Sequence, residues 1–482
     1  MLSEKFRRQL RQETERWLRE GTIDRSTYEK LADRYQFSDL ESSAKNRFTA
    51  LLMSLGGILM GVGTIIFVAA NWEAWSRFSR LILLLSLFFS VNGTGFYLWR
   101  KPTMPPSYRQ LGQGLLLLGA IVLGANMALM SQLFGDSGNL YELFLAWGLG
   151  VAFMSASLRL TSLGVLAAIL LQIGYWIGLS SSSIAPEGSW GKAIVEHMPL
   201  VGLFVFIPLA YWCRSPAIFG LGAIAAMTSF LANLLRFQGW AIELAIALPP
   251  ALFWAYRDRL WQFGRWRHLT SVLEGRFRAI ARRLAVLFLS AVLYVFSFNI
   301  WHYLKLGNLD FDRWQSLRAF IVDIAIVGAL TLLGWLQLRS PGDSTGGSPE
   351  TQDRFQQWRA VNSPTVAALI LLVGTLLFWH LHVAPIPLFG TISMNIMLFL
   401  FSISLVRDGL AAGVRRTFWG GTLLLSLSIV SRMLEYNTGL LLKSFVFVLC
   451  GVGAIVAGLA FEQTLKKSKP LSIPPSSQEE AP

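Results

Sequence analysis

The sequence predicts an all-α, polytopic membrane protein with about fourteen transmembrane helices and a short cytoplasmic helical hairpin at the N-terminus. Of its 482 residues, 54% are hydrophobic and only 15% are charged. The apolar residues gather in repeated runs of roughly 17 to 24 residues, and each run can cross a hydrocarbon core of about 30 Å. The 18 Trp and 33 Phe residues fit aromatic belts at membrane interfaces. A membrane β-barrel would instead show alternating strands of about ten residues.

The first 48 residues precede the apolar runs and are highly charged. One helix with an apolar stripe through Trp17 is expected to end at Gly21, because glycine commonly terminates helices. A second helix is expected to begin near Asp24 or Ser26, both of which are favoured at helix starts. The two helices predict a hairpin, which is either a membrane-proximal amphipathic element or a docking module.

The expected spans fall into two groups, residues 49–256 with eight helices and residues 284–461 with six. Residues 462–482 are rich in Pro, Ser and Glu, a composition typical of a disordered tail. The expected spans are 49–70, 79–98, 111–134, 140–158, 160–179, 198–213, 215–235, 240–256, 284–302, 318–338, 363–382, 386–406, 414–432 and 440–461.

A basic cytoplasmic loop, residues 257–283, separates these two groups, and its arginines alternate with aromatic residues. Such a pattern can bind RNA, but between two membrane spans it favours an interfacial helix on anionic lipid. The arginines expected to face lipid are Arg265, Arg267, Arg276 and Arg278.

The net charge of +14 is explained by topology. With fourteen spans both termini share one side, and most of the 42 Lys and Arg residues fall there. The positive-inside rule makes that side cytoplasmic, so we expect a plasma (inner) membrane protein that contacts anionic lipid and no nucleic acid. Cys213 and Cys450 lie in or at the ends of apolar runs and imply no disulfide framework. No cleavable signal peptide is expected, since the first span can act as its own insertion signal.

Small residues form stripes along two expected spans. Gly57, Gly61 and Asn71 lie on one face of the first span, and Gly124 and Gln132 share a face of the third. Such stripes allow helix backbones to approach closely, with a polar side chain placed to hydrogen-bond across the interface. We interpret these five residues as helix-packing positions.

Several carboxylates fall in outer loops or in the outer halves of spans, and they form a candidate polar vestibule. An ionisable group inside a span is a functional candidate by default, because burying its charge is costly. The alternative is that each group lies within a turn of the interface and reaches headgroup water. The candidates are Glu73, Asp136, Glu142, Glu243 and Asp323.

Familiar catalytic signatures do not occur. The sequence around Lys192 lacks the P-loop pattern, and neither His-Glu-x-x-His nor Cys-x-x-Cys is present. Asp310 and Asp312 form an Asp-x-Asp pair that can hold a metal but more simply belongs to a solvated loop. His380 and His382 point about 200° apart on a helix, so one metal reaches both only if the helix has ended. We therefore expect no metal and no cofactor, and catalysis remains unassigned.

Three segments together resemble a known family. They read WLREGTIDRSTYEKLADRY (17–35), LGGILMGVGTIIFVAANWEAW (55–75) and LGANMALMSQLFGDSGNLYELFLAWGL (123–149). This order resembles the predicted membrane proteins called domain of unknown function 2157, in which a cytoplasmic helical segment precedes a Gly-rich span and a span that ends in Gln and a Gly-Asp-type turn. The resemblance covers about residues 1–160 and implies a membrane topology but no activity.

Three functions follow as hypotheses. The first is a transporter or channel that moves a small polar or ionic solute past the outer carboxylates. The second is a membrane scaffold or sensor that binds a protein partner through residues 1–37. The third is an enzyme that acts on a lipid-linked substrate, and only the Asp-x-Asp pair supports it.

Overall fold

The computed structural model describes residues 4–35, 70, 74–101, 105–134, 139–181, 189–235, 242–257, 274–304, 313–339, 361–435 and 439–467. These residues are almost entirely helical and contain no strand, so the all-α prediction is confirmed. Contacts divide the chain into two units, Met1–Ser86 and Leu87–Pro482, and each is described separately.

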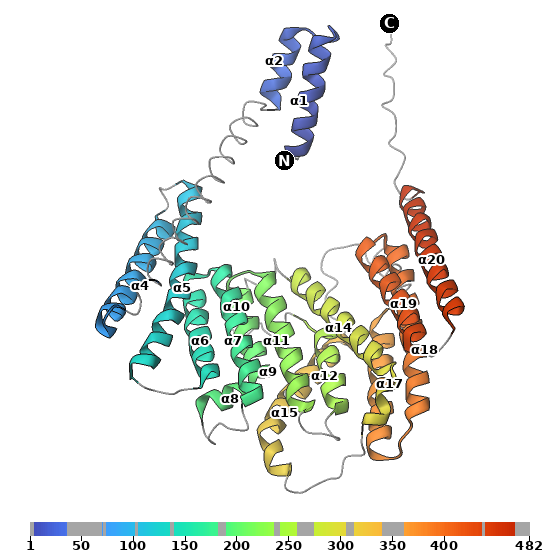
Figure 1. Cartoon of the computed structure of the whole chain (residues 1–482). Coiled ribbons are helices and arrows are strands. Elements are labelled where there is room, and N and C mark those ends of the chain that lie inside the picture. Colours follow the sequence, from blue (N-terminus) through green and yellow to red (C-terminus); the bar gives the residue numbers. More distant parts are fainter. Residues whose placement is uncertain are drawn as a thin grey trace. The chain divides into compact units, whose positions relative to one another are not determined.

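The first unit contains the hairpin of α1 (Glu4–Arg19) and α2 (Arg25–Arg34), which pack against each other (Figure 1). The α1 helix ends where Gly21 adopts a left-handed φ of 72°. There the Thr22 N–H donates to the Trp17 carbonyl (2.9 Å), the long-range bond of a Schellman motif. Asp24 caps α2 by accepting from the Thr27 N–H at 3.2 Å. Both ends therefore follow from local sequence signals.

The rest of the chain forms a bundle of long apolar helices. Among the described residues, eleven helices are long and apolar enough to cross a membrane, or twelve if one bent pair counts as a single span. Residues 49–69 of the first expected span, 49–70, lie outside the described residues. The helices of this part are α4 (Arg77–Arg100), α5 (Pro106–Phe134), α6 (Leu140–Leu158), α7 (Thr161–Ser181), α8 (Trp190–Glu196), α9 (Met198–Val201), the π-helix η1 (Gly202–Phe206), α10 (Ile207–Trp212), α11 (Pro216–Leu235), α12 (Ile242–Trp254), α14 (Glu274–Phe296), the 3-10 helix η4 (Asn299–Tyr303), α15 (Arg313–Arg339), α17 (Ser363–His382), α18 (Pro387–Ala412), α19 (Arg415–Glu435) and α20 (Leu440–Lys467).

The bundle contains two tight hairpins, α6 with α7 and α18 with α19 (Figure 1). The second turns at Gly413, whose φ is 63°. Its helices touch at Gly409, where an added Cβ would lie 2.3 Å from the Phe418 nitrogen. Small residues thus allow direct backbone contact, as expected for helices that cannot rely on a hydrophobic driving force in lipid.

The α12 helix differs from the expected span 240–256. It has 13 residues, which gives about 20 Å at 1.5 Å per residue, short of the hydrocarbon thickness of about 30 Å. Pro249 and Pro250 lie inside it, and each lacks the N–H that an intrahelical bond needs. Most of its side chains are buried, and it packs against α11, α14, α15 and α17. It is therefore a central helix enclosed by protein.

The basic segment also differs in part from the expectation. Helix α14 begins at Glu274, before the expected start of the span at residue 284. Phe277, expected in the lipid interface, is fully buried and stacks on Phe219 with ring centroids 4.8 Å apart. Arg276 is exposed and Arg278 is half-buried on the same helix. Arg265 and Arg267 lie outside the described residues.

Candidate functional site

A broken helix organises the site. Helix α8 and the segment Met198–Trp212 meet at His197 with a bend of 75° between them. Pro199 follows the break and cannot donate to the Val195 carbonyl as a helical residue would. Pro208 is the second residue of α10, which directly follows the π-helix η1, and π-bulges occur where the ladder of helical bonds is disturbed. The prolines explain why this apolar run is not one straight span.

Asn233 of α11 satisfies the carbonyls at the break. Its Nδ2 donates to the Glu196 carbonyl at 2.8 Å and to the Val195 carbonyl at 3.4 Å. Its Oδ1 accepts from the Tyr175 hydroxyl at 2.9 Å. Asn233 is 2% exposed and Tyr175 is fully buried, so three helices are joined in a buried polar network, which rigidifies a site when its members are bonded.

Asp323 of α15 meets His197 at this break. The carboxylate Oδ1 lies 2.7 Å from the imidazole Nδ1. Asp323 is 1% exposed, whereas the His197 side chain is 36% exposed. Asp323 Oδ2 is buried and has no hydrogen-bond partner among the described residues. A buried carboxylate needs partners to stay ionised, so Oδ2 is a position where a proton or a cation can bind.

Glu243 and His382 form a second pair of the same kind. Glu243 Oε1 lies 3.2 Å from His382 Nε2, and the side chains are 14% and 21% exposed. The other oxygen, Oε2, is buried and unpaired within the described part of the chain. Glu243 belongs to the first turn of α12, where the helix dipole favours negative charge. His382 is the last residue of α17.

His380 has a different role from His382. Its Nδ1 accepts from the Ile386 N–H at 2.9 Å, and its Nε2 lies 3.0 Å from the Trp301 carbonyl. These contacts fix the tautomer with the proton on Nε2, because the acceptor nitrogen must be unprotonated. The two histidines thus engage separate partners, and His380 ties the α17–α18 turn to η4.

Glu142 is bonded through hydroxyl groups. Its Oε1 accepts from the Ser189 hydroxyl at 2.6 Å and from the Tyr141 hydroxyl at 3.1 Å. An added Cβ on Gly191 would lie 2.7 Å from Glu142 Cγ, so the glycine admits the carboxylate to the start of α8. This contact connects α6 to α8, the first part of the broken helix.

Glu435, which the sequence also places on the outer side, belongs to an arginine clamp that the sequence does not predict. Arg432 of α19 donates to the Ser297 carbonyl at 2.7 Å and to Glu435, and its guanidinium lies 3.9 Å from the Phe298 ring centroid. Glu435 in turn accepts from the Asn299 N–H at 3.2 Å. The clamp joins the end of α19 to the end of α14.

The packing position Gly124 lies on α5 against α6. An added Cβ would come within 2.4 Å of the Trp147 ring, whose indole N–H donates to the Ala120 carbonyl at 2.7 Å. Gln132 is on α5, and its side chain lies outside the described residues. Gly57, Gly61 and Asn71 also lie outside them.

The structure thus places three of the five vestibule candidates: Glu142, Glu243 and Asp323. Glu73, Asp136 and the Asp310–Asp312 pair lie outside the described residues, so one vestibule for all five stays a prediction. Each carboxylate contact above joins residues that the sequence places on the same side of the membrane. Within the described part, no group of three or more His, Cys, Asp or Glu side chains is arranged to hold a metal.

The broken helix and the carboxylate partners were not predicted. His197 and Asp323 are 126 residues apart in sequence, and topology alone indicates only that they share a side. Two signals were available: Pro199, two residues after His197, and Asn233 within an apolar run, where a polar side chain usually bonds across helices.

Comparison with known proteins agrees with the expected resemblance. Residues 15–164 match the family described as predicted membrane protein (DUF2157). No curated protein and no solved structure matches the chain. The protein is accordingly a predicted membrane protein with several apolar helices that contact the bilayer. Both carboxylate–histidine pairs lie beyond the matched part, so the family carries no information about them.

Proposed function

We propose that the protein moves a small polar or ionic solute across the membrane, and that Asp323 and His197 bind a proton or cation during the process. The observation that carries this proposal is the burial of Asp323 beside a broken helix with one carboxylate oxygen unpaired. Ionisable residues within spans are costly and mark ion pathways. Discontinuous helices are a recurrent way to build such sites in transporters.

The exposure of the pair supports a direction of transfer. His197 is partly exposed and Asp323 is enclosed, so an ion from water meets the imidazole before the carboxylate. The imidazole has a ring nitrogen that can carry a proton. Asp323 Oδ2 then provides an acceptor deeper in the bundle, and the Glu243–His382 pair provides a second one.

The proposal places the protein in the plasma (inner) membrane with both termini in the cytoplasm. The excess of Lys and Arg on the side shared by the termini supports this orientation. Anionic headgroups on that side are expected partners of Arg276, which is exposed on α14, and of the neighbouring basic residues.

Flux through purified protein tests this function. Proteoliposomes with entrapped pyranine report proton movement after a pH jump, and tracer sodium and rubidium report cation movement. Asp323→Asn and Glu243→Gln are expected to reduce the flux at least tenfold. Asp408→Asn is the matched control, because Asp408 is a buried carboxylate that accepts from the Val361 N–H at 2.9 Å near the opposite end of the bundle. Unchanged flux in Asp323→Asn, or no flux of any probe, would contradict the transport proposal.

A second candidate is a scaffold or sensor in which residues 1–37 bind a protein partner. Trp17 supports it, because this large aromatic side chain remains 36% exposed after α1 and α2 pack. Exposed tryptophans are frequent anchors of interfaces. If deletion of residues 1–37 leaves every co-purifying partner in place, this candidate is refuted.

A further inference from the structure

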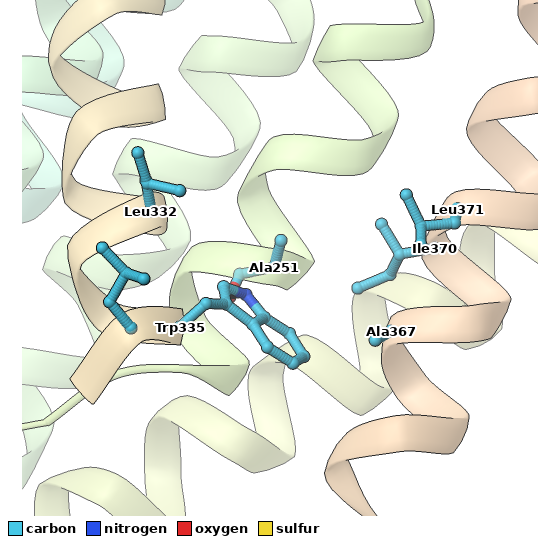
Figure 2. A pocket seen from close by; sticks show the side chains of 7 residues that line it. Ala251, Leu332, Trp335, Ala367, Ile370 and Leu371 are labelled. Atoms are coloured by element: carbon cyan, nitrogen blue, oxygen red, sulfur yellow. Dashed lines mark hydrogen bonds between the residues drawn. The ribbon is translucent and has the colours of Figure 1, made fainter. Parts of the chain in front are cut away.

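A groove runs between two membrane helices on the flank of the bundle. It encloses about 320 Å³ between α15 and α17, with the short α12 as its floor. Figure 2 shows Leu332 and Trp335 on one wall, Ile370 and Leu371 on the other, and Ala251 between them. The lining is apolar, since the one indole N–H at the floor is used in a 3.1 Å bond from Trp335 to the Ala251 carbonyl.

The groove faces the membrane. Leu332 is 62% exposed and Leu371 is 69% exposed, and both belong to helices that can span a bilayer. Because the side chain of Ala251 is small, it leaves space between α15 and α17. Gly334 allows α15 to approach α12 closely, since an added Cβ would lie 3.1 Å from the Ala255 Cβ. A hydrocarbon chain is the ligand that suits such a lining in this environment.

Two arginines lie near the ends of the helices that form the groove. Arg257 follows α12 and donates through Nη1 to the Gln337 carbonyl at 2.7 Å, one residue beyond Leu336, which also lines the groove. Arg257 therefore lies at the end of the α15 wall. This end is on the predicted cytoplasmic side.

Arg282 reaches the same end from α14. Its guanidinium lies 5.4 Å from the Trp254 ring centroid, and the Trp254 indole donates to the hydroxyl of Ser363, the first residue of α17. Arg282 is thereby linked to the end of the α17 wall. Guanidinium groups stay charged and bind phosphate through several N–H donors.

We propose that this groove binds one anionic phospholipid, with an acyl chain along Leu332 and Leu371 and with the headgroup phosphate between Arg257 and Arg282. The two features are complementary only to an amphiphile, because a free phosphate would use the arginines without the groove and a neutral lipid would use the groove without the arginines. This site is separate from the carboxylate–histidine pairs and from the diffuse lipid contact expected of Arg276.

Native mass spectrometry of the full-length protein in detergent tests the site. The probes are dioleoyl-phosphatidylglycerol and dioleoyl-phosphatidylcholine, which share acyl chains and differ in charge. We expect a preference for the anionic lipid, and a loss of about fivefold in affinity for each of Arg257→Gln and Arg282→Gln, since a basic residue at an anionic surface contributes about 1 kcal/mol. Arg283→Gln is the control, because Arg283 is the exposed neighbour on α14.

Groove filling provides an independent test. Leu332→Trp is expected to reduce phosphatidylglycerol binding, whereas Ile224→Trp is not, although Ile224 lines a similar apolar groove between α7 and α11. Arg282→Lys keeps the charge and should retain most of the binding. The proposal is overturned by equal affinity for the two lipids, by an equal loss in Arg282→Lys and Arg282→Gln, by an equal loss in Arg283→Gln, or by competition from 10 mM inorganic phosphate together with unchanged binding in Leu332→Trp.

Discussion

Asn233→Leu removes the side chain that holds the broken helix, and its effect can be worked out from three bonds. Leucine has nearly the shape of asparagine, so the change removes hydrogen bonds and leaves little cavity. The bonds to Glu196 and from Tyr175 measure 2.8 and 2.9 Å, and the bond to Val195 is weaker at 3.4 Å. Hydrogen bonds between membrane helices average about 0.6 kcal/mol and reach about 1.7. A buried carbonyl left without a partner costs about 1–3 kcal/mol. We therefore expect Asn233→Leu to lower the free energy of unfolding by about 2–3 kcal/mol.

Reversible unfolding in mixed micelles, followed by tryptophan fluorescence, measures this change. Tyr175→Phe removes the hydroxyl, which donates to Asn233 Oδ1 at 2.9 Å and reaches the Ser229 carbonyl at 3.3 Å, and should cost about 0.6 kcal/mol. The double variant should show coupling between Tyr175 and Asn233. Ser229→Ala is the control, because that hydroxyl bonds within its own helix at 2.6 Å. If Asn233→Leu costs no more than Tyr175→Phe, then Asn233 does not stabilise the break; if the two changes are additive, then the bond between Tyr175 and Asn233 makes no contribution of its own.

Three further predictions concern other parts of the fold. Arg432→Lys cannot keep both the bond to the Ser297 carbonyl and the aromatic stacking, and it should lower the free energy of unfolding by about 1–2 kcal/mol in the same micelle assay. Gly409→Ala places a Cβ 2.3 Å from the backbone of α19 and should destabilise by about 3 kcal/mol or more, whereas Gly420→Ala, with nothing within 4 Å, should be neutral or slightly stabilising. Hydrogen bonds from Ser26 and Thr27 lower the pKa of Asp24 to about 2, from an ordinary value of about 3.9. The cap of α2 should therefore be intact above pH 5 and weaken as the pH falls from about 4 to 2. Amide hydrogen exchange in α2 of the full-length protein can follow this weakening. Exchange rates that do not depend on pH, after correction for the intrinsic rate, would contradict the prediction.

The fold class was predictable because each long apolar run forms its own helical hydrogen bonds and needs no distant partner. The ends of the hairpin were predictable for the same reason, since Gly21 and Asp24 act on neighbouring residues. The break at His197 was not predicted, because the run 198–213 satisfies the length and hydropathy of a straight span. Its bend depends on Pro199 together with Asn233, which lies on another helix.

The candidate site shows the same division between local and distant information. The sequence locates Asp323 and Glu243 near one membrane face, because topology needs only the order of spans. It does not identify their imidazole partners, since several outer histidines are compatible with that topology. His380 illustrates this, because it resembles His382 in sequence but bonds to backbone groups of η4 and of the α17–α18 turn.

The two carboxylate–histidine pairs are alike in geometry but differ in what stabilises the charge. Glu243 lies in the first turn of α12, and His382 lies in the last turn of α17, so helix dipoles favour an anion at one and a cation at the other. Asp323 is well inside α15, which begins at Arg313, so the dipole of its own helix does not stabilise its negative charge. Its ionised form therefore depends more on His197, whose position is set by the break that Pro199 creates. A movement of that break would change the charge that Asp323 can hold, which makes the bent helix the element through which ion binding and conformation would be coupled.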